Sequence, residues 1–155
     1  MNSLKYIAEQ TKLSSYELSV SGTDTRNHVL DHVSQLLTER TVDIVAANQI
    51  DYQNGKTSGL NDQMLDRLLL TPERIEGIAT DVQTIKNLDD PVGEIIEQKT
   101  LENGIELKKV RVPLGVLGSI YESRPNVTID IACLAIKSGN AALLRGGKES
   151  VNSNV

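Results

Sequence analysis

The sequence predicts an α/β protein in which helices lead into a β-hairpin and then into the start of a parallel sheet. Three observations support this fold class. Residues 1–92 repeat apolar side chains at helical spacing. The dipeptide Asn103-Gly104 then separates two strand-like runs. Within residues 113–155, two short apolar runs flank an apolar helix, which is the pattern of a β-α-β unit.

Amphipathic helices account for the first of these observations. Their apolar faces comprise Leu4, Ile7 and Ala8; Val29, Leu30, Val33, Leu36 and Leu37; Ile44, Val45, Ala47 and Ile50; and Met64, Leu65, Leu68 and Leu69. Thr23 or Asp24 is the expected N-cap of the second helix, and Asn54-Gly55 is expected to end the third. Thr71 followed by Pro72 predicts a capped start for a further helix that runs through Ile85.

The pattern changes at Pro91-Val92-Gly93, after which two strands are expected, Glu94–Leu101 and Ile105–Val112. Asn103-Gly104 between them is a strong hairpin signal because both residues tolerate a positive φ angle. The apolar residues of the second strand alternate only in part, so the sequence leaves the pairing register open.

The last segment predicts a strand, a polar loop, a helix and a second strand. The first strand is expected over Val116–Tyr121, and Pro125 disfavours a helical residue before it, so the chain turns there. The helix is expected over Val127–Lys137, ended by Ser138-Gly139-Asn140, and a strand buried on both faces over Ala141–Leu144. Two such strands joined by a helix favour a right-handed parallel crossover, as at the start of an α/β nucleotide-binding domain.

The composition is that of a soluble globular protein. The chain has 155 residues, of which 39% are hydrophobic and 24% are charged, near the globular average. Its net charge of −5 and its sequence pI of about 5.0 argue against general binding to nucleic acid or to anionic membranes. No apolar run is long enough to span a bilayer, and the N-terminus lacks the apolar core of a signal peptide. A cytoplasmic location is therefore expected.

The first strand of the β-α-β unit lies in the run Pro113-Leu114-Gly115-Val116-Leu117-Gly118, and its helix ends in Gly139-Asn140. With the polar loop between them, this pattern resembles the aldehyde dehydrogenase superfamily. Residues 121–126 (Tyr-Glu-Ser-Arg-Pro-Asn) and 144–149 (Leu-Arg-Gly-Gly-Lys-Glu) resemble, within it, the γ-glutamyl phosphate reductase (glutamate-5-semialdehyde dehydrogenase) family. Further similar residues upstream are Ala46-Ala47-Asn48, Asp51, Gly59-Leu60, Met64 and Leu65-Asp66-Arg67-Leu68. The resemblance covers nearly the whole chain and implies the N-terminal portion of such an enzyme.

This resemblance implies an aldehyde dehydrogenase-like fold in three parts. Residues 1–92 would form the helical N-terminal part of the nucleotide-binding domain, residues 93–112 a β-hairpin of the oligomerisation type, and residues 113–155 the start of the βαβ core. In the superfamily this hairpin projects from the domain and helps to build the oligomer, so a homo-oligomer formed through residues 94–112 is expected. The alternative is a hairpin packed on its own domain.

The resemblance also implies an oxidoreductase of L-proline biosynthesis that uses NADPH to reduce a small molecule, γ-glutamyl phosphate, to glutamate 5-semialdehyde and phosphate. In that family a cysteine thiolate displaces the phosphate, and hydride from the nicotinamide then reduces the thioester. The family's nucleophile lies beyond Val155, so this segment alone is expected to be inactive. Two alternatives remain: a non-catalytic product that assembles with a full-length subunit, and a relative that acts on another acyl substrate.

The polar loop before the helix holds the candidate catalytic residues. Superfamily members place an asparagine amide there to stabilise an oxyanion, and Asn126 is the only amide in this loop. Counted from Gly118, however, the superfamily's position falls on Arg124, whose planar guanidinium suits a substrate carboxylate or phosphate. Both residues are candidates, beside the alternative that they only shape a turn before Pro125.

The turn after the second strand holds the candidate cofactor-binding residues, Arg145, Gly146, Gly147 and Lys148. Two glycines let backbone N–H groups approach a phosphate, and a following helix N-terminus adds positive potential. Arg145 and Lys148 would neutralise a ribose 2′-phosphate and so favour NADPH over NADH. Superfamily members carry a lysine at the position of Arg145. The alternative is a basic turn on the surface.

The remaining reactive side chains are not expected to form a site. Cys133, the only cysteine of the chain, lies at helical spacing with Ile129 and Ile136, where a thiol behaves as a small buried hydrophobe. His28 and His32 share a helix face, but no neighbouring Cys or Glu completes a metal site. We therefore expect neither a nucleophile nor a metal here.

Overall fold

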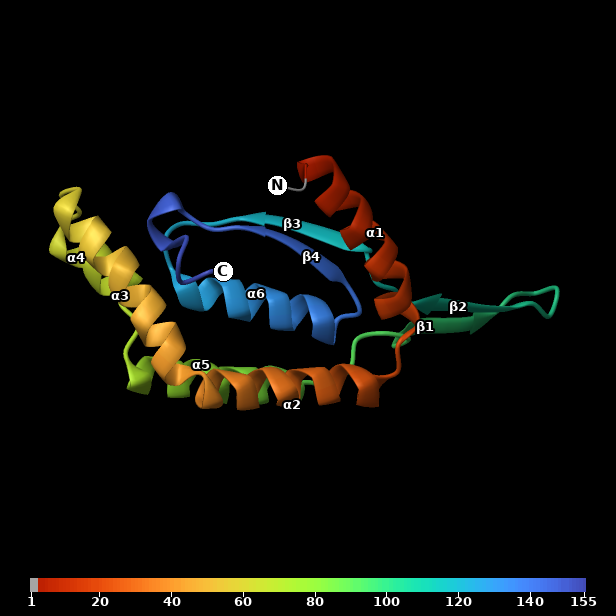
Figure 1. The fold of residues 1–155 in the computed structure, drawn as a ribbon. Coiled ribbons are helices and arrows are strands. Elements are labelled where there is room, and N and C mark those ends of the chain that lie inside the picture. The colour runs from red at the N-terminus through yellow and green to blue at the C-terminus, as the bar shows by residue number, and fades with distance from the viewer. Residues whose placement is uncertain (1–2) are drawn as a thin grey trace.

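The computed structural model describes residues 3–155. Its helices are α1 (Leu4–Val20), α2 (Thr23–Glu39), α3 (Thr41–Thr57), α4 (Asp62–Leu68), α5 (Pro72–Lys86) and α6 (Pro125–Lys137). Its strands are β1 (Ile95–Thr100), β2 (Glu106–Val110), β3 (Val116–Ile120) and β4 (Ala141–Arg145), and a 3₁₀ helix, η1 (Lys148–Ser150), follows β4. The α/β class and the order of the elements agree with the sequence prediction (Figure 1). None of the helices in this part of the chain combines the length and the apolar character that a membrane crossing requires.

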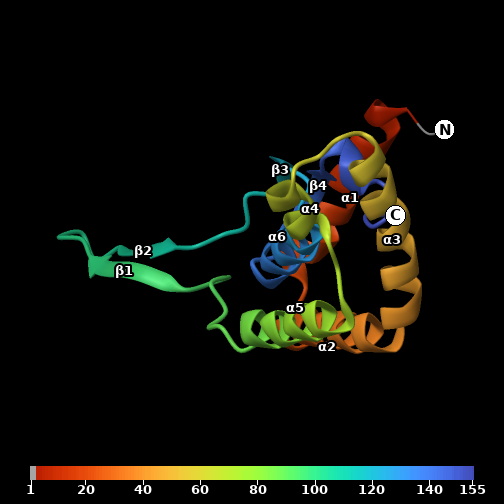
Figure 2. The ribbon, with the colours of Figure 1, turned by 90° about the vertical axis from the view of Figure 1, so that its left-hand side faces the viewer.

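The elements form layers around helix α6. Helices α2 and α5 lie side by side in one layer, α6 packs on them, and the sheet of β3 and β4 lies on the other side of α6 (Figures 1 and 2). Helix α1 packs on the same sheet from the side away from α6 (Figure 1). The core lies between α2, α5 and α6, and its fully buried members include Leu30, Ile75, Val82 and Cys133. The helical first half and the β-α-β unit therefore share one hydrophobic core.

Two polar side chains of α3 form hydrogen bonds with neighbouring segments near α4. Asn48 is fully buried; its amide donates to the Leu68 carbonyl (2.8 Å) and its oxygen accepts from the Leu70 N–H (2.7 Å). Asp51 is also buried and accepts from the N–H groups of Asn152 (3.2 Å) and Ser153 (2.7 Å). Both side chains satisfy backbone groups of segments that lack regular hydrogen bonding, so they hold the α4–α5 connection and the last residues of the chain in place.

The expected N-cap of α2 is wrong. The helix begins at Thr23 with Gly22 as its N-cap, so neither Thr23 nor Asp24 caps it. The Thr23 hydroxyl donates instead to the Asp90 carboxylate, which lies on the distant connection between α5 and β1. The Thr23 side chain thus forms a tertiary hydrogen bond and does not act as an N-cap.

The expected end of α3 is also wrong, whereas the start of α5 is confirmed. Helix α3 continues through Gly55 and ends at Thr57. A Cβ atom on Gly55 would lie 2.8 Å from Leu60 Cδ1, so this glycine makes room for the Leu60 side chain and does not terminate the helix. Thr71 caps α5 as expected, because its side chain accepts from the Arg74 N–H at 3.2 Å.

Strands β3 and β4 form the expected parallel pair, with α6 as the crossover. Val116 pairs with Ala141 and Ile120 with Arg145, so the two strands begin and end together. The loop at 121–124 and the turn at 146–147 therefore lie side by side at the carboxyl edge of the sheet (Figure 1). The expectation that β4 is buried on both faces is wrong: Ala141 is buried, the next three residues are half-buried and Arg145 is exposed, since α1 covers only part of the strand.

Strands β1 and β2 form the expected antiparallel hairpin, which projects from the body of the molecule (Figures 1 and 2). Every residue of both strands is exposed, so the hairpin does not pack on its own domain. At its tip only Gly104 has a positive φ angle (83°), and the Gly104 N–H donates to the Leu101 carbonyl at 2.9 Å. Asn103 does not use its tolerance for positive φ, because the loop spans three residues and needs a left-handed conformation only at its last position.

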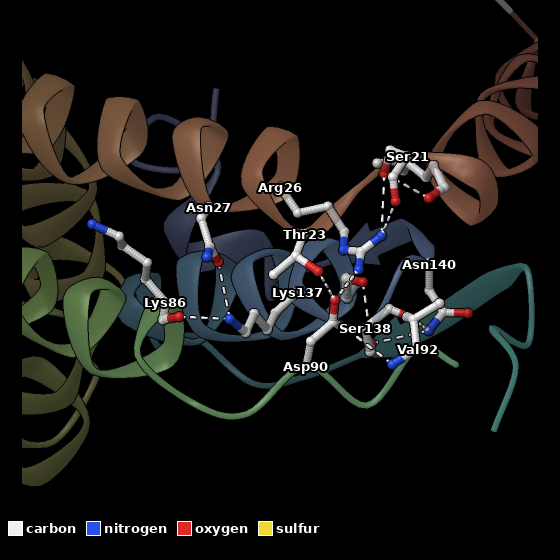
Figure 3. A network of polar contacts seen from close by, with 12 residues as sticks. Ser21, Thr23, Arg26, Asn27, Lys86, Asp90, Val92, Lys137, Ser138 and Asn140 are labelled. Atoms are coloured by element: carbon white, nitrogen blue, oxygen red, sulfur yellow. Dashed lines mark hydrogen bonds and ion pairs between the residues drawn. The ribbon is translucent and has the colours of Figure 1, made fainter. Parts of the chain in front are cut away.

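An ion pair between the buried Arg26 and the partly buried Asp90 holds the base of the hairpin against the helical layer (Figure 3). Arg26 of α2 is 2% exposed, pairs with Asp90 and donates to the Ser21 carbonyl. Asp90 also accepts from the Thr23 hydroxyl and from the Val92 N–H, the latter at 2.9 Å. Burial alone would raise the pKa of Asp90, but these hydrogen bonds and the charge of Arg26 hold it below its ordinary value.

Lys137 joins three helices in the same region (Figure 3). This residue of α6 is 4% exposed, and its Nζ donates to Asn27 Oδ1 (2.9 Å) and to the Lys86 carbonyl (2.6 Å). Lys86 is the last residue of α5, where backbone carbonyls have no partner within the helix. The buried ammonium group thus caps α5 from the side and ties it to α2 and α6.

Candidate functional site

The candidate site lies at the carboxyl edge of the β3–β4 sheet. The loop at 121–124 leaves β3 there, the turn at 146–147 leaves β4 beside it, and α6 starts at Pro125. In open α/β sheets ligands bind outside the carboxyl ends of the strands. The structure therefore brings the two groups of residues that the sequence analysis singled out, in the loop and in the turn, to one edge of one sheet.

Arg124 stands at the N-terminal boundary of α6, in an extended conformation that the following proline favours. Its Nε lies 3.1 Å from Glu122 Oε1, and Arg67 Nη1 of α4 lies 3.6 Å from the same oxygen. One carboxylate thus faces two guanidinium groups from distant parts of the chain. The Arg124 side chain is 41% exposed, so water or a ligand can reach it.

Asn126 lies in the first turn of α6 and is half-buried. Its Nδ2 donates to Asp130 Oδ2 at 3.3 Å, which is long for a hydrogen bond to a carboxylate. Burial, and after it the charge of Asp81, raise the pKa of the Asp130 carboxyl, while the bond from Asn126 opposes them. The amide is therefore held by a weak contact along its own helix.

Arg124 and Asn126 line one cavity of about 430 Å³, a size typical of small-molecule sites. The cavity also has charged side chains that the sequence analysis did not select: Asp66, Arg67, Arg74 and Asp81. Arg74 is already engaged, because it pairs with Asp66 (2.6 Å) and donates to the Leu69 carbonyl (2.9 Å). Asp66 and Arg67 belong to a motif that the family resemblance had marked, but nothing in the local sequence indicated that they face Arg124.

The turn after β4 packs tightly against the loop after β3. Ser123 Oγ donates to Glu149 Oε2 at 2.5 Å, and this bond together with the Glu149 N–H lowers the pKa of Glu149. A Cβ atom on Gly147 would collide with the Ser123 hydroxyl and would lie 2.8 Å from Glu149 Oε2. The backbone at Gly147 has an ordinary φ of −62°. Glycine is therefore needed here for the close approach of Ser123 and Glu149.

Arg145 and Lys148 flank this turn and are both exposed. Neither forms an ion pair with any residue in the range 3–155. Two cationic side chains without a fixed partner, at the carboxyl end of a parallel strand, can neutralise a phosphate group.

The other reactive side chains do not contribute to the site. Cys133 is 1% exposed in the core, as expected, and burial followed by the charge of Asp130 raises the pKa of its thiol to about 11. His28 and His32 are both exposed on α2. Within the described part of the chain no group of three His, Cys, Asp or Glu side chains is placed to hold a metal ion.

Comparison with known proteins gives no match to any family model, but individual relatives are similar along the whole chain. The γ-glutamyl phosphate reductase of Psychromonas ingrahamii is 49% identical over 152 residues, which cover 98% of this chain. The crystal structure of γ-glutamyl phosphate reductase from Thermotoga maritima superposes with a TM-score of 0.96 at 38% identity over 99% of this chain. A Bacillus subtilis structure described as an aldehyde dehydrogenase is 20% identical, with a TM-score of 0.67 over 93% of this chain and 30% of its own, and shows the shared fold.

The chain spans 37% of the length of the Psychromonas ingrahamii relative and 37% of the Thermotoga maritima chain. Within that span, sequence and structure agree: the relatives that match nearly all of its residues carry one name, and the fold of one of them superposes on nearly all of its backbone. The chain therefore belongs to the γ-glutamyl phosphate reductase family.

Proposed function

We propose that this chain forms part of an enzyme that uses NADPH to reduce γ-glutamyl phosphate to glutamate 5-semialdehyde and phosphate. The observation that carries the proposal is the match of 98% of the chain, at 49% identity, to a protein named for this activity. The arrangement of the site supports it. Candidate substrate contacts lie in the loop after β3, and candidate cofactor contacts lie in the turn after β4, at the same edge of the sheet.

The residues around the turn fit a phosphate-bearing nicotinamide cofactor, which supplies hydride when bound. Arg145 and Lys148 are exposed and have no ion-pair partner among residues 3–155, so they would hold its phosphates. A pair of cations favours NADPH because only this form carries a ribose 2′-phosphate. Gly146 and Gly147 would contribute by keeping the turn close to the loop at 121–124, which sets the distance between cofactor and substrate.

In the loop, we assign Arg124 to the substrate because its guanidinium is half-exposed and lines the cavity. Asn126 lines the same cavity and would serve as the oxyanion donor once its amide turns away from Asp130, from which it gains little at 3.3 Å. The reaction also needs a thiolate nucleophile. Cys133, the one cysteine of this sequence, cannot supply it because the side chain is buried with a pKa of about 11.

The projecting hairpin supports assembly into a homo-oligomer. A two-stranded hairpin is marginally stable in water, and β1 and β2 are exposed throughout, with Ile95, Ile96 and Leu107 each about half exposed. Pairing with another copy would cover these side chains. The same surface suits a non-catalytic product that joins a full-length subunit, which is the second function we retain. We place the enzyme in the cytoplasm, in proline biosynthesis.

The test is an activity assay on the full natural chain in the oxidative direction. We expect NADP⁺ to be reduced only when both glutamate 5-semialdehyde and inorganic phosphate are present. Cys133→Ser should retain that activity. Turnover of a different aldehyde with phosphate, and none with glutamate 5-semialdehyde, would show instead a relative that acts on another acyl substrate.

A further inference from the structure

The cavity of about 430 Å³ beside Arg124 combines both signs of charge. Arg67 comes from α4, Arg124 from the start of α6, and Asp81 from α5. Arg74 and Asp66 neutralise each other. The cations and the anion that remain come from separate elements, so the fold itself places them around one space.

The two arginines already face a carboxylate. Glu122 Oε1 lies 3.1 Å from Arg124 Nε and 3.6 Å from Arg67 Nη1, and the Glu122 side chain is 63% exposed. A guanidinium has five N–H donors, and a single exposed carboxylate uses few of the ten that this pair offers. No other ion pair or side-chain hydrogen bond engages Arg67 or Arg124 within residues 3–155. A ligand carboxylate therefore finds two guanidinium groups with free donors. Arg67 lines the cavity from α4 and Arg124 from the start of α6.

On the side of Asp81 the cavity favours a positively charged group. This carboxylate is exposed and lines the cavity, and its charge acts on Asp130 strongly enough to contribute to the raised pKa of that group. Neither aspartate has a cationic partner in the described part of the chain; the Asn126 amide is the hydrogen-bond donor to Asp130. Two neighbouring carboxylates without a cation favour an ammonium group on a ligand.

We propose that this cavity binds the α-amino-acid head group of the substrate, with its carboxylate against Arg67 and Arg124 and its ammonium group against Asp81. The inference rests on the proposed function, because γ-glutamyl phosphate carries such a head group at the end opposite its phosphate. A ligand with both charges pairs with both sides of the cavity. An anion without an ammonium group is repelled by Asp81, and a cation without a carboxylate is repelled by the arginines. The cavity would thus select an amino acid over a dicarboxylate or an amine of the same length.

Isothermal titration calorimetry on the full natural chain tests this with three probes. L-glutamate carries the whole head group, glutarate lacks its ammonium group, and 4-aminobutyrate lacks its carboxylate. We expect L-glutamate to bind at least about tenfold more tightly than either probe, since each loses a charge-assisted contact. Arg67→Gln should weaken L-glutamate about tenfold and leave 4-aminobutyrate unchanged. Asp81→Asn should weaken L-glutamate about tenfold and leave glutarate unchanged or improved.

Exposed residues that do not line the cavity supply matched controls. Arg40→Gln, just after α2, and Asp24→Asn, near its start, remove the same charges and should leave all three affinities unchanged. The inference is overturned if L-glutamate does not bind, or if it binds equally well in both cavity variants. The reductase assay is read separately. Reduction of γ-glutamyl phosphate with a KM that neither cavity variant changes would reject the head-group site alone, whereas charge-selective binding without reductase activity would reject the proposed function alone.

Discussion

Asn48 and Leu70 are joined by a hydrogen bond of 2.7 Å from the Leu70 N–H to Asn48 Oδ1, across 22 residues of sequence. The same side chain donates to the Leu68 carbonyl at 2.8 Å, and it is 0% exposed. One amide therefore satisfies the carbonyl of the last residue of α4 and an N–H group of the short connection to α5. The side chains of Leu68 and Leu70 are both buried.

Asn48→Ala is expected to lower the free energy of unfolding by about 2–4 kcal/mol. The substitution leaves one buried carbonyl and one buried N–H group without partners, and each costs about 1–3 kcal/mol. Urea denaturation followed by circular dichroism would measure the change. Asn54→Ala, on an exposed position of the same helix, is the matched control and should change the free energy by less than about 0.5 kcal/mol. Equal effects of the two substitutions would show that the buried hydrogen bonds contribute nothing.

Asp90→Asn is expected to destabilise the protein by about 3 kcal/mol at neutral pH, because it leaves Arg26 buried without its charge partner. The pKa of Asp90 is lowered in the fold, so the stability that its charge contributes is present above the unfolded value of 3.8 and is lost as the pH falls through the folded value. The difference between the two proteins should therefore shrink in acid. Urea titrations from neutral pH to below 3.8 would measure it, with Asp24→Asn as the control. A difference independent of pH would argue against this role of the ion pair.

Cys133 should react slowly with iodoacetamide in the folded protein. Only the thiolate is alkylated, and the pKa of about 11, against an ordinary value of 9.0, reduces its fraction near pH 8 by about a hundredfold. Mass spectrometry would compare the rate with that of the chain unfolded in urea.

In keeping with this, the 155-residue polypeptide alone is expected to consume no NADPH with γ-glutamyl phosphate. Consumption that disappears in Cys133→Ser would contradict this expectation.

Arg145→Ala or Lys148→Ala is expected to weaken NADPH more than NADH in the full natural chain. Loss of a charge-assisted contact to the 2′-phosphate costs about 1.5–3 kcal/mol, or roughly tenfold or more in affinity, and NADH does not make that contact. Fluorescence titration of both cofactors measures the two dissociation constants. Lys5→Ala, an exposed lysine on α1, serves as the control. Equal losses for NADPH and NADH would mean that neither residue recognises the 2′-phosphate.

The 155-residue polypeptide is expected to self-associate through its hairpin. Strands β1 and β2 have unpaired edges and exposed apolar side chains, which recruit other strands. Size-exclusion chromatography with light scattering should show an oligomer for residues 1–155. Leu107→Lys on β2 should weaken association, whereas Val42→Lys, at an exposed apolar position on α3, should not. A monomeric 1–155, or a Leu107→Lys variant that associates as strongly as the natural sequence, would contradict the idea.

Much of the fold could be predicted from local sequence because each element follows a short-range rule. Thr71 and Pro72 start α5 as expected, and the parallel pairing of β3 with β4 follows from two apolar runs joined by a helix. The errors arise where a distant residue decides. The Thr23 hydroxyl donates a hydrogen bond to Asp90, 67 residues away, and Gly55 accommodates the Leu60 side chain and does not end its helix.

The candidate site shows the same division. Arg124 and Asn126 could be selected because they lie in one loop beside a proline, and the basic turn at Arg145 follows directly from a strand. Their distant neighbours could not be selected in this way. Arg67 of α4 pairs with Glu122, and Asp81 of α5 lines the cavity, so only the packing of α4, α5 and α6 reveals the cavity.

The chain enters and leaves the hairpin at a single place. The Gly93 N–H donates to the Arg111 carbonyl at 3.0 Å, and the Arg111 N–H donates to the Glu94 carbonyl at 2.9 Å, so the two ends of the excursion are adjacent. Because Asp90 anchors this stem to Arg26 before the strands begin, the residues beyond it are free to vary without disturbing the body. Mutation can thus lengthen, shorten or recompose the hairpin as an independent module. Changes in the hairpin can then accumulate while the sheet edge and its charged cavity stay unchanged.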